Sequence, residues 1–285
     1  CWGYNNYGQL GDGTTTDRNT PTQTSSLGTD RTAVAISASR YHTCAILDDA
    51  SVVCWGYNAY GQLGDGTTTD RHTPTQTSSL GTDRTAVAIA AGEYHTCAIL
   101  DDGSVSCWGN NGYGQRGDGT NTQRNTPTQT SSLGTDRTAV AIAAGIFHTC
   151  AILDDGSVSC WGRNNYGQIG DGTTNNRNTP TQTSSLGTDR TAVAISAGRF
   201  QTCAILDDAS VVCWGQNDYG QLGDGTTTDR NTPTQTSSLG TDRTAVAISA
   251  VTWHTCALLD DESLSCWGYN MYGQLGDGTT TDRHT

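Results

Sequence analysis

The cysteines are the residues of this chain whose spacing points most directly to chemistry. The sequence holds 11 of them, and ten form five pairs with nine residues between the two partners. Such pairs can form disulfides, bind a metal, or fill a core as reduced apolar side chains. The pairs are Cys44 and Cys54, Cys97 and Cys107, Cys150 and Cys160, Cys203 and Cys213, and Cys256 and Cys266, with Cys1 left over.

The residues between the paired cysteines favour a disulfide. In the second pair, two β-prone runs flank Asp101-Asp102-Gly103, which is typical of a hairpin loop. With these three residues in the loop, Cys97 lies directly opposite Cys107, and opposed residues of this kind have Cα atoms about 4.5 Å apart, which a disulfide accepts. Metal binding fits less well because the close cysteine spacing of zinc sites is absent. Reduced thiols buried in a core remain the alternative.

Disulfides persist only in oxidising compartments, so these pairs predict an extracellular or cell-surface location. The charge composition adds to this expectation. All 15 basic residues are Arg, whereas 28 residues are acidic, and the net charge is −13. This charge disfavours nucleic acid and anionic membrane surfaces as partners, and an Asp-rich surface without Lys suits a saline environment. No apolar run is long enough to predict insertion into a membrane.

Two further repeated groups suggest metal or acid–base chemistry, and both have simpler explanations. The histidines are expected to brace their own strands by hydrogen bonds to backbone. The Gly-Asp-Gly loops place two carboxylates five residues apart, as in Asp65 and Asp70, but two units lack the second carboxylate. Solvated turn residues are therefore preferred over calcium ligands. Since no nucleophile is paired with a base, the sequence predicts a non-enzymatic protein without a cofactor or metal. The repeated histidines are His42, His95, His148 and His254.

All of these residues recur because the chain is an array of repeats. Cys-Trp-Gly returns every 53 residues without insertion or deletion, which predicts units that bury their apolar faces against neighbours. We expect a longer chain to complete the array, because the last unit is partial. The units are 1–53, 54–106, 107–159, 160–212 and 213–265, followed by 266–285.

Within one unit, the pattern predicts four short strands and no helix. A polar extended run at 74–79 begins with Pro, which an edge strand tolerates. A buried strand of small residues is expected at 86–91, and the hairpin supplies strands at 96–100 and 104–108. Four strands at this period are typical of a β-propeller blade, so the fold class is all-β.

The segment from Ile89 to Ile99, followed by Asp102-Gly-Ser-Val and Trp108-Gly, closely resembles the regulator of chromosome condensation repeat in its bacterial, cysteine-paired type. The resemblance covers every unit. It implies a β-propeller of which this chain forms an incomplete, open ring, and a prokaryotic source. The chain departs from the repeat at Ser39 and Val251, where the family has Gly, and at Gln201, where it has His. Arg116 replaces an aliphatic residue.

Three positions of the repeat vary while the 17 residues from Thr20 to Ile36 are identical in all five full units. One position follows Trp-Gly, one lies two residues further on, and one precedes the His. Since equivalent loops of a propeller share one rim, we interpret these positions as a binding face, with neutral drift as the alternative. This variable rim comprises Tyr4, Asn6, Arg40, Tyr57, Glu93, Asn110, Ile146, Arg163, Asn165, Arg199, Gln216, Asp218, Thr252, Tyr269 and Met271.

The sequence thus predicts a binding or display module of a secreted or cell-surface protein that recognises a protein or a glycan through the variable rim. Two alternatives stay open. The resemblance implies nucleotide exchange on a small GTPase, as in the founding members of the family. A purely structural spacer of an adhesin is the other alternative, because near-identical units suit a stalk.

Overall fold

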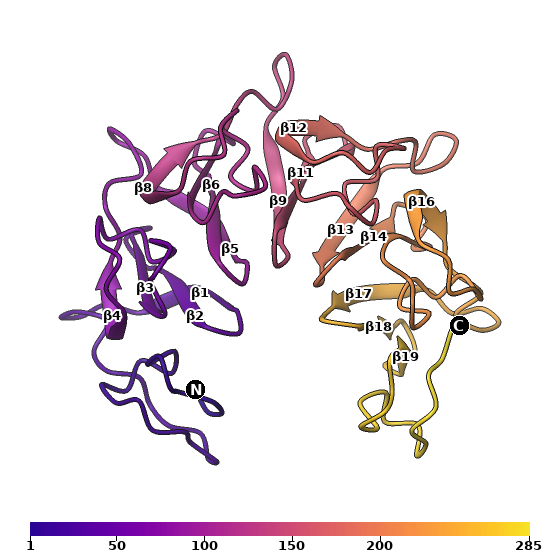
Figure 1. Ribbon diagram of the computed structural model, residues 1–285, viewed down its shortest axis with the longest axis horizontal. Coiled ribbons are helices and arrows are strands. Elements are labelled where there is room, and N and C mark those ends of the chain that lie inside the picture. Colours follow the sequence, from indigo (N-terminus) through magenta and orange to yellow (C-terminus); the bar gives the residue numbers. More distant parts are fainter.

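The computed structural model describes residues 1–285 and contains 19 β-strands in five antiparallel sheets. The sheets follow one another along an arc, with the two ends of the chain at the two ends of the arc (Figure 1). No sheet closes on itself, and no helix long and apolar enough to cross a membrane is found. The prediction of an all-β propeller with an open ring is confirmed.

The five sheets have the same construction, in which each strand pairs with the next one in sequence. The first strand of each sheet lies on the inner side of the arc and the last on the outer side (Figure 1). The sheets are β1 (Ala33–Ala38), β2 (His42–Leu47), β3 (Val52–Gly56) and β4 (Arg71–Gln76); β5 (Ala86–Ala91), β6 (His95–Leu100), β7 (Val105–Gly109) and β8 (Arg124–Gln129); β9 (Ala139–Ala144), β10 (His148–Leu153), β11 (Val158–Gly162) and β12 (Arg177–Gln182); β13 (Ala192–Ala197), β14 (Gln201–Leu206), β15 (Val211–Gly215) and β16 (Arg230–Gln235); and β17 (Ala245–Ala250), β18 (His254–Leu259) and β19 (Leu264–Gly268).

The central hairpin of each sheet has the predicted register. In the second sheet, Ile99 pairs with Val105 and Cys97 with Cys107. The Cα atoms of the two cysteines lie 4.1 Å apart, and the sulfur atoms are bonded. The other four cysteine pairs form the same disulfide, and Cys1 is free. Each sheet is therefore held by a covalent link between its second and third strands.

The hydrophobic cores lie between neighbouring sheets. One core joins the disulfide of Cys44 and Cys54 to Ala98 and Trp108 of the next sheet, and all four residues are fully buried. The indole of Trp108 packs against Gly64, where a Cβ atom would lie 2.7 Å from its ring nitrogen. Replacing such a buried Trp with Ala costs about 3–5 kcal/mol. Adjacent sheets thus depend on one another, as the repeat period predicts.

Three of the four repeated histidines join neighbouring sheets, which corrects the expectation that each braces its own strands, whereas His254 of the last sheet makes no such contact. The Nε2 atom of His42 lies 2.8 Å from the hydroxyl of Thr96 in the next sheet. His95 contacts Thr149 and His148 contacts Thr202 in the same way. In the fourth sheet, the amide of Gln201 donates to the carbonyl of Val251 instead, so the bridge survives the loss of the His.

Candidate functional site

Two of the three variable positions come together at one edge of every sheet. The backbone N–H of Arg163 donates to the carbonyl of Phe147 over 2.8 Å, and Phe147 directly follows the variable Ile146. The N–H of Tyr57 donates in the same way to Tyr41, which follows Arg40, over 2.9 Å. Equivalent bonds join Asn110 to Tyr94, Gln216 to Phe200 and Tyr269 to Trp253. Residues from two successive repeat units therefore lie side by side on this face.

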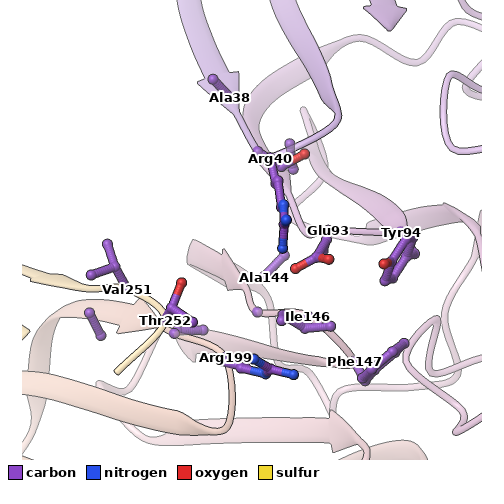
Figure 2. A pocket seen from close by; sticks show the side chains of 16 residues that line it. Ala38, Arg40, Glu93, Tyr94, Ala144, Ile146, Phe147, Arg199, Val251 and Thr252 are labelled. Atoms are coloured by element: carbon purple, nitrogen blue, oxygen red, sulfur yellow. The ribbon is translucent and has the colours of Figure 1, made fainter. Parts of the chain in front are cut away.

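The variable residues that precede the His converge further, around one shared cavity of about 490 Å³. They come from five successive sheets, and their side chains surround the opening (Figure 2). Small residues at the ends of the inner strands, such as Ala144, complete the wall. A single ligand in this cavity would therefore contact up to five repeat units. The five variable residues are Arg40, Glu93, Ile146, Arg199 and Thr252.

The third variable position occupies the tip of the loop that follows Trp-Gly. Asn6, Asn165, Asp218 and Met271 are all exposed there. Met271 accepts a hydrogen bond from the hydroxyl of its neighbour Tyr269 over 3.2 Å. One predicted rim residue is not available for binding: Gln216 is only 8% exposed, and its amide nitrogen is bonded to Asp218.

The sequence interpretation missed a belt of aromatic rings that includes three residues of the variable rim, Tyr4, Tyr57 and Tyr269, and eleven others. Neighbouring rings have centroids between 4.9 and 6.3 Å apart. Two positions of the repeat carry an aromatic residue in every unit, and this regularity would have revealed the belt. One position directly precedes the His, as Tyr41 does, and the other lies four residues after the Gly of Trp-Gly, as Tyr60 does. We call this set the aromatic belt: Tyr4, Tyr7, Tyr41, Tyr57, Tyr60, Tyr94, Tyr113, Phe147, Tyr166, Phe200, Tyr219, Trp253, Tyr269 and Tyr272.

Arg163 takes the place of a ring in the aromatic belt. At the equivalent position, Tyr57 contacts Tyr7, Tyr41 and Tyr60. The guanidinium of Arg163 lies 5.2–5.8 Å from the corresponding three rings and 4.7 Å from the centre of Phe200. Arg199 lies 5.1 Å from Phe200 and 5.0 Å from Trp253. Cation–π contacts thus continue the belt where ring–ring contacts stop.

Comparison with known proteins identifies the family to which this architecture belongs. The family model of the RCC1-like domain matches residues 1–285. This chain belongs to the RCC1-like domain family. The ultraviolet-B receptor UVR8 of Arabidopsis thaliana is 32% identical over 283 residues, which cover 99% of this chain and 63% of the receptor. The RCC1-like chain therefore spans less than two thirds of that relative.

Two solved structures show the same fold. Human WBSCR16 superposes with a TM-score of 0.84 at 23% identity, covering 98% of the RCC1-like chain and 73% of WBSCR16. Yeast RCC1 (Prp20), whose crystal structure has Kap60 bound, superposes with a TM-score of 0.84 at 20% identity, covering 100% and 69% of the two chains. Membership of the RCC1-like family supports a role in protein interaction or regulation.

The acidic loops of the RCC1-like chain are turn-forming structures whose carboxylates are occupied. One oxygen of Asp65 accepts bonds from the backbone and hydroxyl of Thr67, and the other accepts from Arg71 over 2.7 Å. Burial by itself would raise the pKa of Asp65, but the bonds from Thr67 and Arg71 lower it. Asp70 accepts from the backbone N–H of Asn58 over 2.7 Å. The sequence interpretation called these residues solvated, yet the side chain of Asp65 is only 4% exposed.

In the third unit, a different arginine pairs with the carboxylate of the acidic loop. Arg116 is fully buried where other units have an aliphatic residue, and its guanidinium bonds to Asp118 and to the carbonyl of Thr122. Burial lowers the pKa of Arg116 to about 10, although Asp118 acts in the opposite direction. Arg116 therefore occupies the carboxylate that, in other units, pairs with the Arg equivalent to Arg124.

The buried histidines are not placed for acid–base catalysis. His42, His95 and His148 are each fully buried between sheets. Burial lowers the pKa to about 3 for His42 and His95 and to about 4 for His148, far below the usual value near 6.5. Their contacts with threonines of the next sheet stabilise the array.

Proposed function

We propose that this chain is a protein-binding module that recognises its partner through the variable rim. The convergence of three variable positions on one face supports the proposal. Five of these residues surround one cavity, although they come from five repeat units. In contrast, the segment from Thr20 to Ile36 is identical in every full unit. The yeast RCC1 structure with Kap60 bound provides a precedent for a protein partner on this fold.

Exposed tyrosines give the most direct test. Tyr4 is 47% exposed, and Tyr57 and Tyr269 are partly exposed at the equivalent positions of other units. Aromatic side chains at such positions carry a large share of the binding free energy in protein interfaces. Replacing all three with Ser should abolish the binding of a partner identified by site-specific photo-crosslinking from residue 57. Crosslinking from Thr82, in the identical segment, is the matched control.

The same partner should bind with unchanged affinity to a variant that carries Ser at Val87, Val140 and Val193, which are exposed on the inner strands β5, β9 and β13. Unchanged affinity of the triple tyrosine variant would remove the variable rim as the binding face. Loss of binding in both variants would indicate a general loss of structure, so each variant is first compared with the parent by thermal unfolding.

We further propose that the module works outside the cell or at its surface. Five disulfides, all formed in the structure, support this location because they persist only in oxidising compartments. The test is a count of free thiols in denatured, non-reduced protein from its native source. A single free thiol in the segment from Cys1 to Thr285, or none where Cys1 pairs with a residue outside this segment, supports export. Eleven free thiols would contradict it and favour the nucleotide-exchange alternative.

A further inference from the structure

Three arginines of the variable rim lack the acidic partner that most of the other arginines have. The chain has 15 basic residues, all Arg, and most of them lie within 4.0 Å of a carboxylate. Arg40, Arg163 and Arg199 do not, and the fourth exception, Arg124, has lost its partner to Arg116. The protein has a net charge of −13, so its arginines would be expected to find acidic partners. Three arginines without such partners on one face therefore form an exception to the charge of the rest of the surface.

Arg163 and Arg199 are held by aromatic rings and not by hydrogen bonds. Both guanidinium groups lie within about 5 Å of the Phe200 ring, at 4.7 and 5.1 Å from its centre. Their Nε atoms are shielded from solvent and have no hydrogen-bond partner. Leaving a shielded donor unpaired costs about 1–3 kcal/mol, and two like charges beside one ring repel each other. Both side chains stay partly exposed, so an anion that contacts the open ends of the two guanidinium groups would offset the repulsion between them.

The surroundings select the kind of anion. Arg199 and Arg40 line the same cavity, in which Glu93 is the only acidic residue. In Figure 2, Arg40 extends toward Glu93, whereas Arg199 points toward Phe147 and away from that carboxylate. Ile146 and Phe147 give this part of the wall an apolar character. The planar guanidinium fork binds carboxylates with two parallel hydrogen bonds, and the apolar wall accommodates a hydrophobic neighbour.

We propose that Arg163 and Arg199 form a carboxylate-recognition site for an acidic peptide segment of the protein partner, in which an acidic residue stands next to an apolar one. The proposal rests on the proposed function, since it names the chemistry of the partner at the same face. A peptide fits better than nucleic acid because the phosphate backbone would be repelled by the acidic remainder of the surface.

The test uses fluorescein-labelled peptides and the whole chain. The probe has the core Glu-Phe-Glu flanked by glycines, and the matched peptide has Gln-Phe-Gln. Fluorescence anisotropy should show at least tenfold tighter binding of the Glu peptide. The double variant Arg163→Gln with Arg199→Gln should lose at least tenfold, and the two Lys substitutions should lose part of that, because Lys keeps the charge without the planar fork.

The matched control removes the same two charges elsewhere. Arg137 and Arg190 form surface ion pairs with Asp155 and Asp208 at the hairpin loops, and the Arg137→Gln, Arg190→Gln variant should bind the Glu peptide like the parent chain. Equal loss in this control, or no preference for Glu over Gln, would overturn the carboxylate site. A third outcome separates the two proposals. If both peptides bind equally well to the parent chain and neither binds to the triple tyrosine variant, the carboxylate site is wrong but the proposed function stands. Tighter, Arg-dependent binding of a uronate oligosaccharide would replace the peptide with an acidic glycan.

Discussion

The Nε2 atom of His95 lies 2.8 Å from the hydroxyl oxygen of Thr149, across the boundary between two sheets. That hydroxyl donates its own proton to the backbone carbonyl of Gln115 over 2.9 Å. The bond from His95 must therefore be donated by its Nε2–H group, which leaves Nδ1 as the unprotonated nitrogen. Nδ1 has no partner in the structure. A second proton on Nδ1 would create a buried donor without an acceptor, so burial favours the neutral imidazole with its proton on Nε2.

Acid should weaken the array well above the pH at which its carboxylates titrate. In the unfolded chain the histidines bind protons below about pH 6.5, whereas burial holds the pKa in the folded chain at about 3 for His42 and His95 and about 4 for His148. Unfolding then takes up protons, so the free energy of unfolding falls as the pH falls from about 6.5 to about 4. Each histidine contributes roughly 1.4 kcal/mol per pH unit. Urea unfolding at pH 7.5 and at pH 5 measures the difference.

The natural Gln201 provides the variant that isolates this effect. Gln201 keeps a bond to the next sheet without a titrating group. The His95→Gln variant should therefore lose about one proton from the pH dependence of unfolding while remaining folded at pH 7.5. A pH dependence equal to that of the parent chain would contradict the assignment. The same substitution at His284, which is exposed in the last loop, is the matched control.

We expect the removal of the buried charge of Arg116 not to lower the free energy of unfolding. Replacing Arg116 with Leu, as found at Leu63, should leave the free energy of unfolding unchanged or raise it by about 1–4 kcal/mol, because a buried ion pair is often no better than a well-packed apolar side chain. The Asp118→Ala substitution should instead cost about 3–5 kcal/mol, because it leaves the buried guanidinium without a counter-charge. Equilibrium unfolding in urea measures both effects.

A double-mutant cycle separates the ion pair from the turn. In the Arg116→Leu background, Asp118→Ala should cost less, since it removes only the turn bonds from Asn111 and Thr120 and the partly exposed pair with Arg124 that the other units form. Equal costs in the two backgrounds would show that Asp118 acts through the turn alone. Asp65→Ala in the second unit, where Leu63 is already aliphatic and Asp65 pairs with Arg71, is the natural reference for the Arg116→Leu background.

The sequence was sufficient to predict those parts of the fold that depend on local chemistry and on the repeat. The turn at Asp101-Asp102-Gly103 sets the hairpin register, and the register brings Cys97 and Cys107 together. The period of 53 residues predicts equivalent contacts in every unit, so one correct hairpin gives all five. The all-β class follows from the same short β-prone runs.

Contacts between units were not predictable in the same way. A period shows that His95 has the same role as His42, but it does not say whether the partner belongs to the same sheet or to the next one. The aromatic belt was missed for this reason, since Tyr41 and Tyr57 are 16 residues apart in sequence and meet only across a folded sheet. Burial of Gln216 likewise depends on its folded surroundings. The variable rim as a binding face stays a prediction.

The disulfides should behave as interior bonds. Both sulfur-bearing residues of the second pair, Cys97 and Cys107, are 0% exposed and lie between sheets. Millimolar dithiothreitol should therefore leave the bonds intact in native buffer and reduce them once urea unfolds the array, which alkylation and mass spectrometry can follow.

Replacing both cysteines with Ala should lower the free energy of unfolding by about 3 kcal/mol, because the unfolded chain regains the entropy of a short closed loop. In the 285-residue chain, Cys1→Ala should have no such effect, since Cys1 has no partner within it. Rapid reduction of all five bonds under native conditions would show that the sheets open independently, because a buried bond becomes accessible only when its surroundings separate.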